Sequence, residues 1–319
     1  MPAAIALSFT WLVFLGPKAF GQPEATATEI SPGVYRSNAV IQVHSDLVLI
    51  PVTVTDHTGK TVSGLEKQHF SVFEDSARQD IVHFVSEDAP ASIGIVFDTS
   101  GSMRSKMSKA REAVNRLLDG ANPDDEFFFV KFNTEARLTV SLTHATDDIR
   151  RQVDMLRANG TTALLDGVRL AIGEMEHAHN SRKALVIISD GEDNSSLWTV
   201  PELKRAVRER EIVIYSIGIP GMPGEGSDCI PGRQCGAALL KEISNQTGGH
   251  LFVVRQVAEL PAVMATIGEW LRHQYVLGYV PSRAEKDGTY RRVAVKLERP
   301  KGFPKMNVVW RQGYYAPTQ

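Results

Sequence analysis

The middle of the chain alternates between short apolar runs and longer segments of helical periodicity, and this alternation restricts the fold more than any other feature. Five runs have the length and composition of buried strands: Ile93–Phe97, Phe127–Phe132, Ala184–Ser189, Ile212–Ile219 and His250–Val254. Strands separated by helices form βαβ units, whose strands lie parallel in one sheet. The sequence therefore predicts an α/β domain with a doubly wound, mainly parallel sheet.

Between these runs, apolar residues recur at the spacing of one helical face. The clearest faces are Met103, Met107, Ala110, Val114 and Leu117; then Leu165, Val168, Ile172 and Met175; and a shorter one of Leu203, Ala206 and Val207. Methionines at this spacing are typical of core packing rather than of a cofactor cleft. Residues 259–274 are expected to form the last helix of the domain.

Both flanks of this region change to the alternating period of β-strands. The expected strands are Leu47–Thr55, Phe70–Glu74 and Ile81–Val85 before it, and Tyr275–Val280, Arg292–Leu297 and Met306–Arg311 after it. Isolated hairpins bury too little surface to be stable, so we expect the flanks to pair. The α/β domain, residues 90–272, would then be inserted between the halves of one small β-sandwich, residues 45–89 and 273–319. Two independent β subdomains are the alternative.

The first apolar run leads directly into a loop that carries three oxygen ligands. Asp98, Ser100 and Ser102 occupy alternate positions there. Hard divalent cations such as Mg²⁺ prefer oxygen ligands, and a D-x-S-x-S segment supplies three from one loop. A polar turn after a buried strand is the alternative, because so short a motif also recurs by chance.

Two further segments offer oxygen atoms to the same place. Asp190 directly follows another apolar run, and residues 160–166 read Gly-Thr-Thr-Ala-Leu-Leu-Asp. Ligand sites of open α/β sheets lie beyond the carboxyl ends of the strands, where loops from neighbouring strands converge. Asp98 and Asp190 are therefore expected at the same rim of the sheet.

Together these segments resemble the metal-ion-dependent adhesion site of the von Willebrand factor type A family, whose pattern is D-x-S-x-S, then a Thr, then an Asp. The resemblance implies a Rossmann-like domain that binds Mg²⁺, or Mn²⁺ or Ca²⁺. The ligands it implies are Asp98, Ser100, Ser102, Thr162 and Asp190. Asp190 would bind directly or through water, and Thr161 is the alternative to Thr162. The natural partner in this family is a protein whose Asp or Glu carboxylate completes the coordination.

The flanks add a finer resemblance, to a group of von Willebrand factor A-related proteins described from acidobacteria. It is carried by segments spread over most of the chain, among them residues 52–56 (Val-Thr-Val-Thr-Asp), 247–249 (Thr-Gly-Gly), 274–275 (Gln-Tyr) and 311–315 (Arg-Gln-Gly-Tyr-Tyr). The biological role of that group is poorly defined. This resemblance therefore bears on architecture more than on function.

The amino-terminal sequence indicates where the protein acts. The apolar stretch Ala3–Leu15 is too short for an ordinary membrane span and predicts a secretory signal peptide over residues 1–21, followed by a linker over 22–44. A retained membrane anchor and a buried strand are the alternatives. No later segment is apolar enough to cross a bilayer, so a secreted, periplasmic or cell-surface protein is expected. In such a protein Cys229 and Cys235 could form a disulfide, with two free thiols as the alternative.

Charge and motifs exclude several classes of function. The chain has 35 Lys and Arg against 37 Asp and Glu, with no arginine-rich run, which disfavours nucleic acid as a partner. It has no G-x-S-x-G, H-E-x-x-H or P-loop motif, and His177 and His179 are expected to be solvated on a helix face. We therefore expect a cation-dependent protein-binding module rather than an enzyme. A metal-dependent hydrolase, an adaptor for an intracellular AAA+ ATPase and a purely structural metal site are the alternatives.

Overall fold

The computed structural model describes residues 47–86, 88–190, 193–219 and 236–318. The expected signal peptide, the expected linker and the pair Cys229 and Cys235 lie outside these residues. Over the described ranges, no helix has both the length and the apolar character that a membrane span requires.

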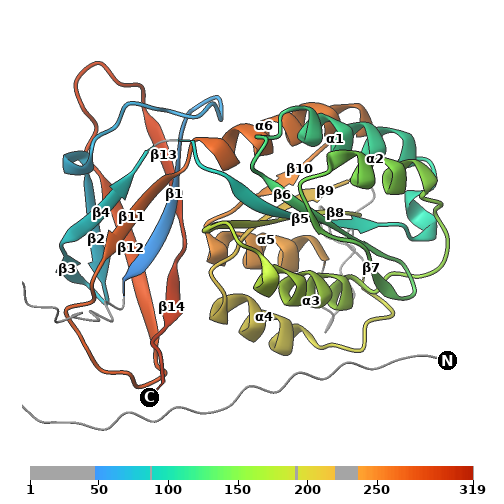
Figure 1. Cartoon of the computed structure of the whole chain (residues 1–319). Helices are drawn as coiled ribbons and strands as arrows, with labels where there is room; N and C mark the ends of the chain where they lie inside the picture. Colours follow the sequence, from blue (N-terminus) through green and yellow to red (C-terminus); the bar gives the residue numbers. More distant parts are fainter. Residues whose placement is uncertain (1–46, 87, 191–192, 220–235, 319) are drawn as a thin grey trace, which may run out of the picture. The chain divides into compact units, whose positions relative to one another are not determined.

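Six strands form the central sheet, in the order β10-β9-β8-β5-β6-β7 (Figure 1). Their bounds are Leu251–Val253 (β10), Val213–Gly218 (β9), Arg182–Ser189 (β8), Ala91–Asp98 (β5), Glu126–Phe132 (β6) and Ala136–Thr143 (β7). Every neighbouring pair is parallel except β6 and β7. Strand β7 is absent from the sequence prediction, because none of its residues is fully buried and its apolar pattern is weak. The predicted fold class is confirmed.

Helices cover both faces of this sheet (Figure 1). Their bounds are Met107–Asp119 (α1), Thr146–Met155 (α2), Leu164–Glu174 (α3), Val200–Glu209 (α4), Gly236–Thr247 (α5) and Leu260–Arg272 (α6). Helices α1, α2 and α6 share one buried cluster with the sheet, and α3, α4 and α5 share the other. Because both faces are covered, β5, β6, β8 and β9 are almost entirely buried.

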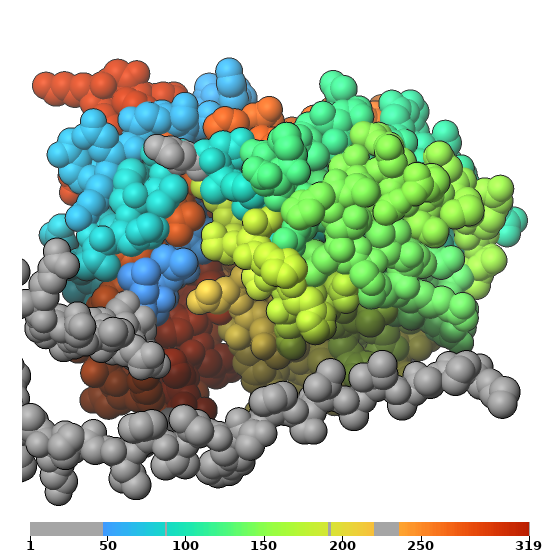
Figure 2. All heavy atoms as spheres, in the orientation of Figure 1, coloured from blue at the N-terminus to red at the C-terminus, as the bar shows by residue number. Residues whose placement is uncertain are grey.

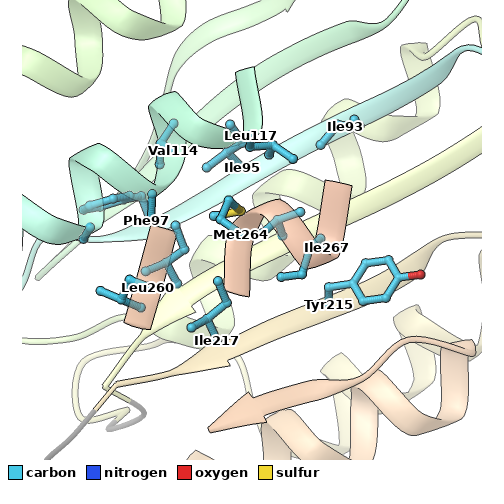
Figure 3. Packing of buried hydrophobic residues seen from close by; sticks show 14 of the residues in the cluster. Ile93, Ile95, Phe97, Val114, Leu117, Tyr215, Ile217, Leu260, Met264 and Ile267 are labelled. Atoms are coloured by element: carbon cyan, nitrogen blue, oxygen red, sulfur yellow. The ribbon is translucent and has the colours of Figure 1, made fainter. Parts of the chain in front are cut away.

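The packing on the first face fixes the position of the central strand β5. Figure 3 shows the side chains that meet there: Ile93, Ile95 and Phe97 of β5, Val114 and Leu117 of α1, Tyr215 and Ile217 of β9, and Leu260, Met264 and Ile267 of α6. On the other face, Gly94 leaves room for neighbouring side chains. A Cβ atom added to Gly94 would lie 2.1 Å from Phe128 Cζ and 2.6 Å from Leu185 Cδ2. Strand β5 is therefore tightly enclosed up to Asp98, its last residue.

The remaining strands form two four-stranded sheets, ordered β13-β1-β11-β4 and β14-β12-β2-β3. Their bounds are Met306–Trp310 (β13), Val48–Asp56 (β1), Tyr275–Tyr279 (β11), Ile81–Val85 (β4), Gly313–Tyr315 (β14), Tyr290–Leu297 (β12), Phe70–Glu74 (β2) and Ala77–Gln79 (β3). Each sheet combines strands from both flanks, and the two sheets share one buried core. Blue and red spheres accordingly adjoin in Figure 2. The flanks form one β-sandwich rather than two subdomains.

One guanidinium joins the two ends of the inserted α/β region. Arg182, the first residue of β8, donates from Nη1 to the carbonyl oxygens of Ala89, at 3.5 Å, and Arg272, at 3.2 Å. Its Nη2 donates to the carbonyl oxygen of Gln274, at 3.3 Å. The Gln274 side chain in turn donates to the hydroxyl of Tyr215, whose pKa burial raises to about 12. The sandwich is thus attached at the amino ends of the strands.

A buried charged cluster ties the two flanks together inside the sandwich. Glu74 of β2 and Arg291 of β12 form an ion pair with an Nη1–Oε1 distance of 3.3 Å. The hydroxyls of Tyr279 and Tyr314 donate to Glu74 Oε2 at 2.8 and 2.7 Å. Burial and the adjoining Glu74 charge raise the pKa of both tyrosines, which therefore remain hydrogen-bond donors.

Removal of the Arg291 charge should destabilise the fold strongly. Arg291→Met leaves the Glu74 carboxylate buried without its cation, and we expect a loss of about 3–5 kcal/mol in the free energy of unfolding. Arg292→Met is the matched control, because the exposed Arg292 contributes its backbone N–H, not its side chain, to the bond with Asp75. Urea denaturation measures both. Equal stability of the two variants would contradict a structural role for the ion pair.

Candidate metal centre

Asp98 lies at the carboxyl end of β5 and is completely buried. Its Oδ1 accepts a hydrogen bond from the Ser100 backbone N–H at 2.8 Å, and its Oδ2 accepts one from the Ser189 hydroxyl at 2.7 Å. Ser189 is the last residue of β8, the strand beside β5. The parallel pairing of two buried strands therefore determines the position of this carboxylate.

The two serines of the first loop lie side by side. The Oγ atoms of Ser100 and Ser102 are 3.0 Å apart. Ser100 directly precedes a short 3-10 turn that spans Gly101–Met103, and Ser102 lies within that turn. The Gly101 N–H donates to the carbonyl oxygen of Gly160 at 3.0 Å, which joins this loop to the second one. Gly160 has a φ of +75°, and a Cβ atom there would lie 2.6 Å from Thr134 Oγ1. This close approach requires glycine.

Thr162 is buried between the second loop, which carries Gly160, and the third loop, residues 193–199. Its N–H donates to Asn194 Oδ1 at 2.9 Å, and its carbonyl oxygen accepts from the N–H groups of Asn194 and Ser195. Thr161 is exposed instead, and its hydroxyl donates to Thr134 Oγ1 and accepts from Ser195 Oγ. The Thr161 hydroxyl is thus already paired outside the site. This difference favours Thr162 as the candidate ligand.

Asp190 follows β8 and is 3% exposed. Its Oδ2 lies 2.8 Å from Lys106 Nζ, whereas its Oδ1 is buried and has no hydrogen-bond partner among the described residues. A buried carboxylate oxygen without a donor is energetically costly unless something else compensates its charge. One oxygen of Asp190 is therefore available to a ligand of the site.

The electrostatics of Asp98 also fit a cation. Burial raises its pKa to about 6, and the nearby Asp190 charge adds to that rise, although hydrogen bonds from Ser100 and Ser189 oppose it. A cation near both carboxylates would offset the cost of burying their charges. The donor set of two carboxylates and neutral hydroxyls suits a hard divalent cation. By this test the residues present fit the expected metal.

Two other carboxylates near the site accept hydrogen bonds that join the third loop and α3. Asp166, in the first turn of α3, accepts the N–H groups of Leu197 and Trp198 at 2.9 and 3.0 Å. Asp193 accepts from the Leu165 N–H and the Ser196 hydroxyl, and burial raises its pKa. Both hold the third loop against α3. They bring that loop, and with it Asn194, next to Thr162.

The structure thus brings the expected residues to one rim of the sheet, formed by three loops. Sequence reasoning missed Lys106, Asn194 and the hydrogen bond from Ser189 to Asp98. Ser189 could have been noticed, because it directly precedes Asp190 and ends a strand. Both His177 and His179 are exposed, as expected, but His177 ends a 3-10 turn and His179 follows it, so neither lies on an α-helix. His179 pairs with Glu126, at the amino end of β6.

Comparison with known families agrees with this fold. Residues 92–266, more than half of the 319-residue chain, match the von Willebrand factor type A domain. The chain belongs to the von Willebrand factor type A domain family. The matched range contains all five candidate ligands.

The relatives of this von Willebrand factor type A chain are distant. Inter-alpha-trypsin inhibitor heavy chain H4 of Bos taurus is 27% identical over 145 residues, which cover 40% of this chain and 16% of the relative. An uncharacterized protein of Borreliella burgdorferi is 25% identical over 200 residues, which cover 56% of this chain and 57% of that relative. A solved von Willebrand factor type A structure from Catenulispora acidiphila covers 87% of this chain and 75% of its own, at 16% identity and a TM-score of 0.49. The chain thus spans less than two thirds of both sequence relatives.

The bonds to Asp166 predict how firmly the third loop is held. Asp166→Ala removes both acceptors, and we expect a loss of about 1–3 kcal/mol in stability together with faster amide exchange at Leu197 and Trp198. Asp166→Asn keeps one accepting oxygen and should have a smaller effect. Hydrogen exchange followed by mass spectrometry measures both. Unchanged exchange in the Ala variant would mean that other contacts hold this loop.

Proposed function

We propose that this chain is a protein-binding module that depends on a divalent cation. Five side chains would hold the cation: Asp98, Ser100, Ser102, Thr162 and Asp190. The observation that carries the proposal is the unpartnered Oδ1 of Asp190, buried at the same rim as the fully buried Asp98. Membership of the von Willebrand factor type A domain family supports a binding role.

The charges of the site favour an acidic partner. Its hydroxyls are neutral, so Asp98 and Asp190 are the candidate ligands that carry charge. A bound divalent cation would supply an electrophilic centre for an anionic oxygen from outside. Ser102 is exposed beside the buried ligands, so the rim is accessible on that side. We infer that an Asp or Glu carboxylate of a partner protein completes the coordination.

A binding role is preferred over hydrolysis because the described residues near the candidate ligands offer no general base that is free for chemistry. Asp166 and Asp193 are engaged by backbone and hydroxyl donors. His179 pairs with Glu126 at the amino end of β6, whereas the candidate ligands lie at the carboxyl ends of the strands. The Oγ atoms of Ser100 and Ser102 lie 3.0 Å apart, and the carboxylate beside Ser100 is Asp98, itself a candidate cation ligand.

Two finer proposals rest on the sequence. The apolar stretch Ala3–Leu15 supports export, to a secreted, periplasmic or cell-surface location. The flank segments, including residues 311–315, support membership of the acidobacterial group of von Willebrand factor A-related proteins.

Cation binding should depend on Asp98. Titration of Mg²⁺, Mn²⁺ and Ca²⁺ into metal-stripped protein by calorimetry should give saturable binding for at least one of them. Asp98→Asn keeps the size of the side chain but removes its charge, so we expect affinity to fall by about 100-fold or more. Asp154→Ala, at an exposed position of α2, is the control and should bind as the wild type does. Absence of binding in the wild type would overturn the proposed function.

The same proteins test the acidic partner. A displayed peptide library selected on the immobilised wild type in the preferred cation should enrich sequences with Asp or Glu. Their binding should disappear in EDTA and on Asp98→Asn. Enriched peptides that bind equally well in EDTA would show that the metal does not mediate recognition.

The two threonines should behave differently. Thr162→Val removes the candidate ligand hydroxyl and should weaken cation binding by about tenfold. Thr161→Val removes a hydroxyl that is paired with Thr134 and Ser195, and should leave the affinity within about twofold. Calorimetry with the preferred cation compares them. The reverse ranking would assign the ligand to Thr161.

A further inference from the structure

Lys106 makes an ion pair with a candidate metal ligand. Its Nζ lies 2.8 Å from Asp190 Oδ2, and the two side chains are 12% and 5% exposed. The Asp190 charge also acts on the carboxylate of Asp98, whose pKa it raises. A pair this buried is far less screened by water and salt than a surface pair.

The position of Lys106 at the start of its helix does not explain why a lysine occurs there. Lys106 is the N-cap of α1, where the helix dipole disfavours a cation, and its side chain makes no capping hydrogen bond. Ser, Thr, Asp or Asn would stabilise the helix better at this position. What a lysine contributes at this position is its contact with Asp190, 84 positions away in the sequence.

We propose that Lys106 is a built-in counterion that competes with the divalent cation for Asp190 and so sets the cation affinity of the site. This inference rests on the proposed function. Without metal, the ammonium neutralises Asp190 through Oδ2 while Oδ1 remains unpartnered among the described residues. Any cation that approaches Oδ1 shares this carboxylate with Lys106 and is repelled by the ammonium charge.

The counterion also determines how much positive charge the site presents to a partner. With Lys106 on Asp190, Asp98 is the one candidate ligand whose charge is not already balanced. The cation then keeps more of its charge for an incoming carboxylate. Lys106 would thus lower affinity for the metal and favour a partner that brings its own negative charge.

The test is a charge-removal series read by two measurements. Lys106→Met keeps the apolar stem and removes the ammonium, Lys106→Gln keeps an N–H donor without charge, and Lys106→Arg keeps the charge. Lys109→Met is the matched control, because Lys109 lies on the same helix and makes an exposed pair with Glu112. Calorimetry with Mg²⁺ gives the affinity, and thermal unfolding in EDTA and in Mg²⁺ gives the stability.

We expect Lys106→Met and Lys106→Gln to bind Mg²⁺ about tenfold or more tightly than the wild type, with Lys106→Arg and Lys109→Met close to it. In EDTA, Lys106→Met should unfold several degrees lower, since Asp190 then lacks its cation, and Mg²⁺ should restore this loss. If Lys106→Met does not fold without metal, the Gln variant supplies the affinity.

The outcomes separate this inference from the proposed function. Unchanged or weaker Mg²⁺ binding in both neutral variants, beside clear binding in the wild type, would overturn the counterion role and leave the metal site intact. Binding in the neutral variants but not in the wild type would support Lys106 as a competitor for Asp190 and would overturn the proposed function of the wild-type chain. No Mg²⁺ binding in any of these proteins would overturn this inference, and no binding of Mg²⁺, Mn²⁺ or Ca²⁺ by the wild type would overturn the metal site as well.

Discussion

The burial of two carboxylates at one rim of an apolar sheet is the constraint on which the site depends. Asp98 and Asp190 each belong to or follow a strand whose residues are nearly all buried, so neither can turn its charge toward bulk water. Burying an unpaired carboxylate is too costly to tolerate. Hydrogen bonds from Ser100 and Ser189 and the ammonium of Lys106 offset part of this cost. The negative charge of the two carboxylates is therefore only partly compensated by these groups.

The loops around these carboxylates are held in place by polar side chains. Several backbone N–H groups at the rim donate to side chains of a neighbouring loop or helix. Asn194 accepts the N–H of Thr162, and Asp166 accepts two N–H groups of the third loop. Side chains of this kind fix a loop without burying apolar surface. Candidate ligands from three separate segments thus keep fixed positions relative to one another.

The α/β fold and the common rim of Asp98 and Asp190 could be predicted from the sequence because both are encoded locally. Each buried strand is a continuous apolar run, and a polar residue such as Asp98 at its end marks the carboxyl edge of the sheet. Lys106 could not be predicted, because its partner Asp190 is distant in sequence and no pattern links them. Strand β7 was missed because a half-buried antiparallel strand has a weak apolar period. The pair Glu74 and Arg291 is likewise a contact between flanks that have no periodic relation.

The β-sandwich depends on the α/β region to bring its two halves together. Strands β1 and β11 are partners although the whole α/β region separates them in sequence, so their pairing carries a high loop-closure entropy in the unfolded chain. The α/β region reduces this cost once it has folded, because Arg182 bonds the backbone at both of its ends, at Ala89 and Arg272. The two flanks then emerge close together. The buried pair of Glu74 and Arg291 requires the two flanks to lie side by side, and the joined ends of the α/β region hold the flanks in that arrangement.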